Sequence, residues 1–82
     1  MNSAQLRAAR GMLNITQADL ATRAQVAKRT LWLFENGQRQ PQAKTLARVQ
    51  MALEQLGVEF IQSDAGRGVF LRSTETKKTP SE

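Results

Sequence analysis

The sequence predicts a mainly α fold in which four short helices are followed by a β-hairpin and a polar tail. Apolar residues recur at helical spacings of three and four through the first 56 residues. After Gly57 this pattern changes to alternation. Because 82 residues suit one small domain, we expect a compact helical body over residues 1–57. A hairpin at 58–72 and a disordered tail at 73–82 complete the predicted organisation.

The first two predicted helices have recognisable ends. Ser3 can cap the first helix. Its inward positions follow helical spacing and are Leu6, Ala9, Arg10 and Leu13. Asn14 is a fitting left-handed stop, and Thr16 with Asp19 forms a variant capping box for the second helix. Because a charged residue lies in the inward stripe, Arg10 needs a partner.

The third predicted helix, "AKRTLWLFEN", follows a tight turn at "QV" and contains three consecutive large apolar residues. One narrow helical face cannot bury all three, because neighbours lie about 100° apart. Leu31 and Phe34, three apart, form the natural inward pair. Leu33 then shares the exposed face of Arg29, and partial burial is expected for Trp32. Gly37 suits the end of this helix.

The fourth predicted helix has the clearest amphipathic pattern of the chain. Its inward residues are spaced three, four and three apart and are Leu46, Val49, Leu53 and Leu56. Gly57 ends it. "VEFIQ" and "VFLRS" are strand candidates joined by the turn residues "SDAGRG". Because an isolated hairpin is marginally stable in water, it must pack on the helices or pair with another chain.

Charge is unevenly distributed along the chain. Residues 1–56 hold eight Lys and Arg against three Asp and Glu, so the whole formal excess of +5 lies there. The remaining residues hold four of each sign. A localised basic excess favours a polyanionic partner.

Composition argues against several classes of function. Without His or Cys, the chain lacks the commonest general base, disulfides and thiolate metal ligands. Its carboxylates are scattered, so we expect no catalytic residues, no metal and no cofactor. No apolar run approaches the roughly 20 residues of a membrane span, and a cytoplasmic protein is expected.

The stretch "TQADLATRAQVAKRTLWLFENGQRQP" resembles the helix-turn-helix of the Cro/lambda-repressor-like family, also called the xenobiotic-response-element family. The usual run of that family is "LTQxxLAxxxGVSxxTIxxxExGxxxP". Ten residues match it in register: Thr16, Gln17, Leu20, Ala21, Val26, Thr30, Leu31, Glu35, Gly37 and Pro41. The resemblance extends over about residues 3–57 and implies a compact four-helix lambda-repressor-like domain that binds double-stranded DNA.

Two residues depart from the family pattern. Gln25 replaces the usual glycine of the turn, where positive φ costs a non-glycine residue about 1 kcal/mol. Ala27 replaces the serine or threonine that caps the third helix, a loss of about 1 kcal/mol. Both departures predict a less firmly fixed third helix.

The resemblance implies roles for individual side chains. Gln17 lies where relatives contact the DNA backbone or a base. Lys28 and Arg29 lie where relatives enter the major groove, and arginine can bind guanine bidentately. The DNA-contact candidates are Gln17, Lys28, Arg29, Trp32, Leu33, Asn36, Arg39 and Lys44. Arg10 and Glu35 are instead expected to form a structural ion pair.

The expected function is that of a sequence-specific transcriptional regulator, a repressor that binds a palindromic operator as a homodimer. The hairpin at 58–72 is the expected dimerisation element. Two alternatives remain open at this point. One is an antitoxin that binds DNA and also holds a toxin. The other is a protein-interaction adaptor that does not bind DNA.

Overall fold

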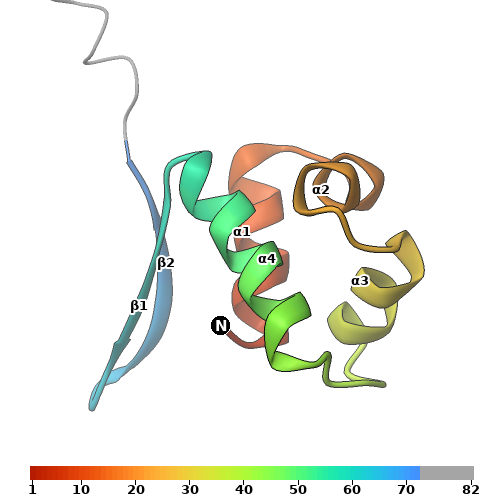
Figure 1. Ribbon diagram of the computed structural model, residues 1–82. Helices are drawn as coiled ribbons and strands as arrows, with labels where there is room; N and C mark the ends of the chain where they lie inside the picture. The colour runs from red at the N-terminus through yellow and green to blue at the C-terminus, as the bar shows by residue number, and fades with distance from the viewer. Residues whose placement is uncertain (73–82) are drawn as a thin grey trace, which may run out of the picture.

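The computed structural model describes residues 1–72 and contains four α-helices followed by a two-stranded antiparallel sheet (Figure 1). The predicted fold class is therefore confirmed. The predicted tail at 73–82 lies outside the described residues. In order, the elements are α1 (Ser3–Leu13), α2 (Gln17–Ala24), α3 (Lys28–Glu35), α4 (Ala43–Gln55), β1 (Val58–Ser63) and β2 (Gly66–Leu71).

The cap of α1 differs from the expected one. Asn2, not Ser3, is the N-cap: its side-chain oxygen accepts from the Gln5 backbone N–H at 2.8 Å. The Gln5 side chain accepts in return from the Asn2 backbone N–H at 2.9 Å, which completes a capping box. The sequence allowed either residue as the cap, and only Asn2 has Gln three residues later.

Left-handed residues end the first two helices, and one of them was predicted as a stop. Asn14 has φ 58° and Gln25 has φ 60°. Asparagine tolerates this conformation well, whereas glutamine does not. Ala27, the N-cap of α3, provides no side-chain hydrogen bond, as expected from the missing hydroxyl. Thr16, in contrast, caps α2 by accepting from the Asp19 backbone N–H at 3.0 Å.

The core lies where the inward faces of the four helices meet. Leu6, Leu20 and Leu53 are fully buried, and Leu31 and Val49 are 1% exposed. Figure 1 shows α1 and α4 between the hairpin on one side and α2 and α3 on the other. The two helices of the helix-turn-helix motif therefore lie on the side of the body away from the sheet.

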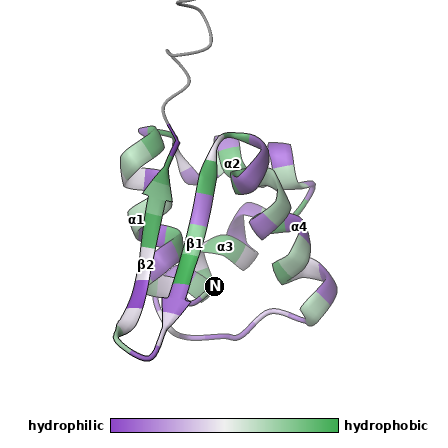
Figure 2. Ribbon diagram, turned by 90° about the vertical axis from the view of Figure 1, so that its left-hand side faces the viewer, coloured by the Kyte–Doolittle hydropathy of each residue, from purple (hydrophilic) through white to green (hydrophobic). Residues whose placement is uncertain are grey.

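The hairpin is joined directly to the core. Gly57, with φ 104°, links α4 to β1, and a Cβ there would lie 3.5 Å from the Leu71 side chain. Val58, the first residue of β1, is fully buried. Val58 pairs with Leu71, and Ser63 pairs with Gly66 at the turn. The sheet packs one face on α1 and α4 and turns its other face outward (Figure 2).

Candidate nucleic-acid interface

The solvent-facing side of α3 carries basic and aromatic side chains. Leu31 and Phe34 anchor the helix, with 1% and 4% of their surfaces exposed. Because these two residues point into the core, the basic first turn of the helix faces solvent. Lys28 and Arg29 are both exposed and, with Trp32, line a shallow hollow of about 310 Å³. Two cations beside an aromatic ring form a surface that suits a negatively charged polymer with stacked aromatic bases.

The three consecutive apolar residues of α3 have different environments. Phe34 is buried, Leu33 is half-buried, and Trp32 exposes 44% of its surface. More than half of the surface of Trp32 is therefore covered, and the residue lines the same hollow as the two cations. An exposed tryptophan beside Lys28 and Arg29 makes this hollow the most distinctive part of the helix.

The C-terminal end of α3 is fixed by its own turn. The Gly37 N–H donates to the Phe34 carbonyl at 3.0 Å, and the Gln38 N–H donates to the Leu33 carbonyl at 2.9 Å. This is a Schellman closure, for which Gly37 supplies the positive φ of 72°. The Asn36 side chain donates to the Trp32 carbonyl at 2.7 Å. In this arrangement the Asn36 amide nitrogen is engaged within the helix end.

Glu35 connects three helices through one buried carboxylate, which is 5% exposed. Arg10 donates to it twice, from Nε to Oε2 at 2.6 Å and from Nη2 to Oε1 at 2.8 Å. The Gln17 amide donates to Oε1 at 3.0 Å. Arg7 donates to the Glu35 backbone carbonyl at 2.6 Å. These contacts join α1 and the start of α2 to the end of α3.

The charge state of this cluster is well defined. Burial alone would raise the pKa of Glu35, but hydrogen bonds from Arg10 and Gln17, with the charges of Arg10 and Arg7, lower it overall. The hydrogen bond with Glu35 raises the pKa of Arg10, although burial opposes the shift. Glu35 is therefore an anion at neutral pH and holds the helices together electrostatically.

Gln17 lies at the first turn of α2, as expected, but its amide nitrogen is occupied by Glu35. The side chain is half-buried, so it is held against α3 rather than free in solvent. Asp19 adds a negative charge to the same helical turn. That charge weakens the attraction of this helix end for a phosphate.

Arg39 and Lys44 lie beyond α3, and both are exposed. Arg39 lines a hollow of about 410 Å³ with Thr30 and Thr45, at the start of α4. The N-cap of α4, Gln42, provides no side-chain hydrogen bond, so its first backbone N–H groups lack that partner. Free N–H groups at a helix start beside a cation suit a phosphate.

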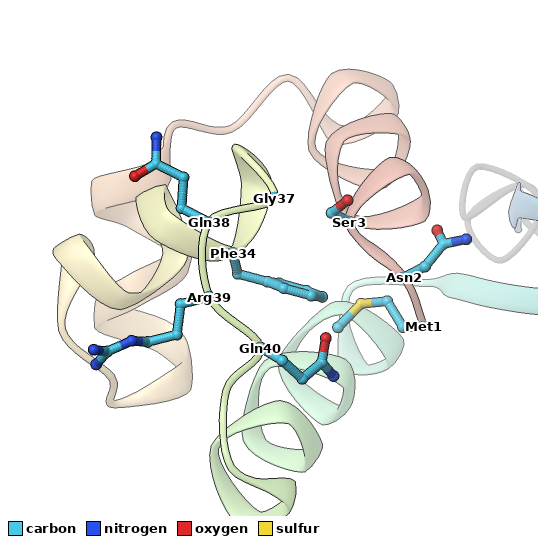
Figure 3. A pocket seen from close by; sticks show the side chains of 8 residues that line it. All are labelled: Met1, Asn2, Ser3, Phe34, Gly37, Gln38, Arg39 and Gln40. Atoms are coloured by element: carbon cyan, nitrogen blue, oxygen red, sulfur yellow. The ribbon is translucent and has the colours of Figure 1, made fainter.

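A third hollow, of about 420 Å³, lies between the N-terminus and the loop after α3. Figure 3 shows the ring of Phe34 pointing toward Met1 at its centre, whereas the Arg39 side chain extends away from it. The polar groups of this hollow come mainly from amides and a hydroxyl. The Arg39 guanidinium therefore belongs to the solvent side of the loop.

Some contacts near this surface were not expected from the sequence. Arg7 was not among the candidate residues, yet it binds the end of α3. Arg48 donates to the Gln25 carbonyl at 3.4 Å, next to the turn between α2 and α3. Its position in an amphipathic helix gave no signal of this contact, because the turn is brought to α4 only by tertiary packing.

The structure supports neither a membrane span nor a metal cluster within residues 1–72. None of the helices there combines the length and apolarity that crossing a membrane requires. No group of three or more acidic side chains there is arranged to hold a metal ion.

Comparison with known proteins agrees with the geometry. The chain matches the helix-turn-helix family HTH_3, the Cro/C1-type or xenobiotic-response-element family, over residues 6–60. No curated protein was found to match the chain. The family implies DNA binding and is typically non-enzymatic. Because the match covers more than half of the sequence, this protein belongs to the Cro/C1-type helix-turn-helix family of DNA-binding proteins.

Proposed function

We propose that this protein is a transcriptional repressor that binds a palindromic operator as a homodimer, with α3 in the major groove. The observation that carries the proposal is the arrangement of α3. Leu31 and Phe34 fix one side of the helix in the core, while Lys28 and Arg29 face solvent from its first turn. In this family architecture the first turn of the third helix meets base edges.

Each candidate residue has a role that suits its position. Arg29 would bind guanine O6 and N7, and Lys28 would reach a base or a phosphate. Trp32 and Leu33 would make apolar contact with thymine methyl groups. Arg39 and Lys44 would bind phosphates on either side of the α4 start. Gln17 and Asn36 would donate to phosphate oxygens through the second amide N–H that their single intramolecular bonds leave available.

In this proposal, the protein represses transcription by occupying its operator on the DNA. The helical body and hairpin contain no further domain within residues 1–72. A bound dimer would act by excluding the transcription machinery from a promoter. One module reads only a few base pairs, whereas two modules a helical turn apart read a palindrome.

A gel-shift titration against random double-stranded DNA, over a range of salt concentrations, tests the binding. We expect affinity to fall steeply with salt, with a logarithmic slope of about −0.9 for each phosphate contact. Arg29→Ala should weaken binding to a selected site by roughly 10-fold or more. Arg67→Ala is the matched control, because Arg67 is an exposed arginine on the hairpin.

Selection of bound sequences from a random pool then tests the operator. An inverted repeat supports the proposed dimer, whereas a single asymmetric site contradicts it. No binding even at low salt would remove DNA as the partner and favour the adaptor function instead.

A further inference from the structure

The outward face of the hairpin carries two large apolar side chains. Ile61 and Phe70 expose 47% and 51% of their surfaces. Ile61 pairs with Gly68, and Phe70 lies two residues further along β2, so the two side chains are diagonal neighbours on one face. Figure 2 shows this face turned away from the helices.

The free edge of β1 offers unpaired backbone groups beside this apolar pair. The Arg72 N–H donates to the Gly57 carbonyl at 2.9 Å, which identifies that pair as hydrogen-bonded. Because bonded and non-bonded pairs alternate, Phe60 and Gln62 direct their backbone groups to the outer edge. Within residues 1–72 these edge groups have no hydrogen-bond partner. Phe60 is half-buried and Gln62 is exposed.

The distribution of charge favours contact between two copies of this chain at their hairpins rather than at their helices. Residues 1–56 carry a formal excess of five positive charges, so two helical bodies repel each other. Residues 57–72 hold Glu59 and Asp64 against Arg67 and Arg72 and are neutral. Two copies can therefore meet at the hairpins with the least repulsion.

Of the two edges, β1 is better suited to pairing than β2. The β1 strand, "VEFIQS", contains no glycine, and its one charge, Glu59, is bound to Arg72 at 3.0 Å. The β2 strand begins "GRG", with two glycines and an exposed arginine. Glycine weakens strand pairing, and a charged side chain on an edge discourages it.

The register follows from burial and charge. Val58 is fully buried, so only Phe60 and Gln62 can offer edge groups to another strand. An antiparallel pairing centred on Ile61 sets Phe60 of each copy opposite Gln62 of the other and needs no further edge residue. It also brings the two Ile61 side chains face to face. A pairing centred on Glu59 would instead place two carboxylates directly opposite each other.

We propose that two copies of this chain pair antiparallel through β1, centred on Ile61, to form one four-stranded sheet. Four main-chain hydrogen bonds join the copies, two at each Phe60–Gln62 pair. On the outward face, the two Ile61 side chains connect the two Phe70 side chains in one apolar row. This interface gives a specific geometry to the homodimer of the proposed function. Its biological purpose rests on that proposed function.

Single-cysteine variants test the register directly, because the natural chain contains no cysteine. Residues opposite each other in a non-bonded antiparallel pair have Cα atoms about 4.5 Å apart, within the range of a disulfide. Ile61→Cys should therefore form a disulfide dimer rapidly under mild oxidation. Glu59→Cys, on the same face but out of register, should form far less of the disulfide dimer under the same conditions. A dimer that forms through Phe70→Cys and not through Ile61→Cys would overturn the proposal.

Sedimentation of charge variants tests the interface without oxidation. Ile61→Arg places like charges face to face and should weaken dimerisation by about 100-fold or more. Met51→Arg is the matched control, because Met51 is a similarly exposed apolar residue on α4. Circular dichroism should show both variants folded. A natural chain that stays monomeric, or an Ile61→Arg variant that dimerises normally, contradicts the interface.

These measurements use no DNA, so they separate this proposal from the proposed function. A dimer with the expected cross-link that binds no DNA would exclude the repressor and leave the β1 interface supported. A DNA-binding protein whose Ile61→Arg variant still binds an inverted repeat with natural affinity would exclude the interface alone.

Discussion

Glu35 is the residue on which the relative placement of three helices depends most. Its carboxylate is buried and receives donors from Arg10 and Gln17, while Arg7 binds its carbonyl. Replacing it leaves Arg10 partly buried without its anion. Removing one partner of a buried ion pair costs far more than the intact pair contributes.

We expect Glu35→Ala to lower the free energy of unfolding by about 3–5 kcal/mol, measured by urea denaturation at neutral pH. Glu59→Ala is the matched control, because its ion pair with Arg72 is about half exposed on both sides. Exposed pairs contribute about 0–1 kcal/mol. Similar losses in both variants would contradict a special role for Glu35.

The same carboxylate predicts how stability depends on pH. The pKa of Glu35 is lower in the folded chain than its ordinary value, so the unfolded chain binds the proton more tightly. Its contribution is complete above the ordinary pKa of about 4.3 and is lost as pH falls through the lowered folded value. The difference in unfolding free energy between the natural chain and Glu35→Gln should shrink over that acidic range. A difference that stays constant on acidification would contradict this linkage.

Phe34 and Leu33 are neighbours with opposite expected roles. Phe34 is 4% exposed, so Phe34→Ala should cost about 3–5 kcal/mol and unfold much of the protein at 25 °C. Leu33 is half-buried, so Leu33→Ala should cost about 1 kcal/mol and leave a folded protein. Circular dichroism and gel shifts distinguish them. A Leu33→Ala variant with natural affinity for the selected operator would exclude the proposed DNA contact of Leu33.

At the scale of elements, the turn between α2 and α3 is where local conformation is least favourable. Gln25 adopts φ 60°, a region that glycine occupies without penalty, and α3 begins without a side-chain cap. The α3 helix is thus held mainly by Leu31, Phe34 and Glu35. Local sequence contributes little to fixing its start.

We expect Gln25→Gly to stabilise the protein by roughly 0.5–1 kcal/mol, because strain relief exceeds the added flexibility of the unfolded chain. The melting temperature should rise by about 2–8 °C in a domain of this size. Asn14→Gly is the matched control: Asn14 has φ 58°, but asparagine tolerates that region. An equal gain at both positions would show that strain at Gln25 is not the cause.

The elements themselves could be predicted because their signals are local. Periodicity located the helices, and alternation with turn residues located the hairpin. The second strand was placed too late, because β2 begins at Gly66, inside the predicted turn "SDAGRG", and ends at Leu71. The choice of Asn2 over Ser3 as the cap was missed, although Gln5, three residues after Asn2, is the sequence signal of a capping box. The contact of Arg48 with the Gln25 carbonyl depends on how α4 packs, which one sequence does not encode locally.

The contacts of Gln5, which attach the hairpin to α1, likewise have no local sequence signal. The sequence pattern did not single out Gln5, yet its side chain is buried, with 5% of the residue exposed. Its amide donates to the Ile61 carbonyl at 3.3 Å and to the Gly68 carbonyl at 2.9 Å. Recognising this role requires knowing that the sheet folds back over α1. The DNA-contact residues stay a prediction, because base contacts depend on a partner.

For the whole molecule, the firm attachment of the hairpin has consequences for DNA recognition. Val58 anchors β1 in the core, and Gln5 bonds both strands to α1. A dimer built on such hairpins holds its two helical bodies in a fixed relation. The two copies of α3 would then meet only half-sites of one spacing, about 34 Å or one helical turn apart.

We therefore expect binding to a selected inverted repeat to fall sharply when about five base pairs are inserted between the half-sites, because half a turn places one half-site on the opposite face of the duplex. Gel shifts with repeats of graded spacing measure this directly. Gln5→Ala removes the bonds to both strands and should lessen the discrimination between spacings, while Arg67→Ala, an exposed change on β2 of the same hairpin, should preserve it. Equal affinity for every spacing in the natural protein would mean that the hairpin does not fix the two bodies.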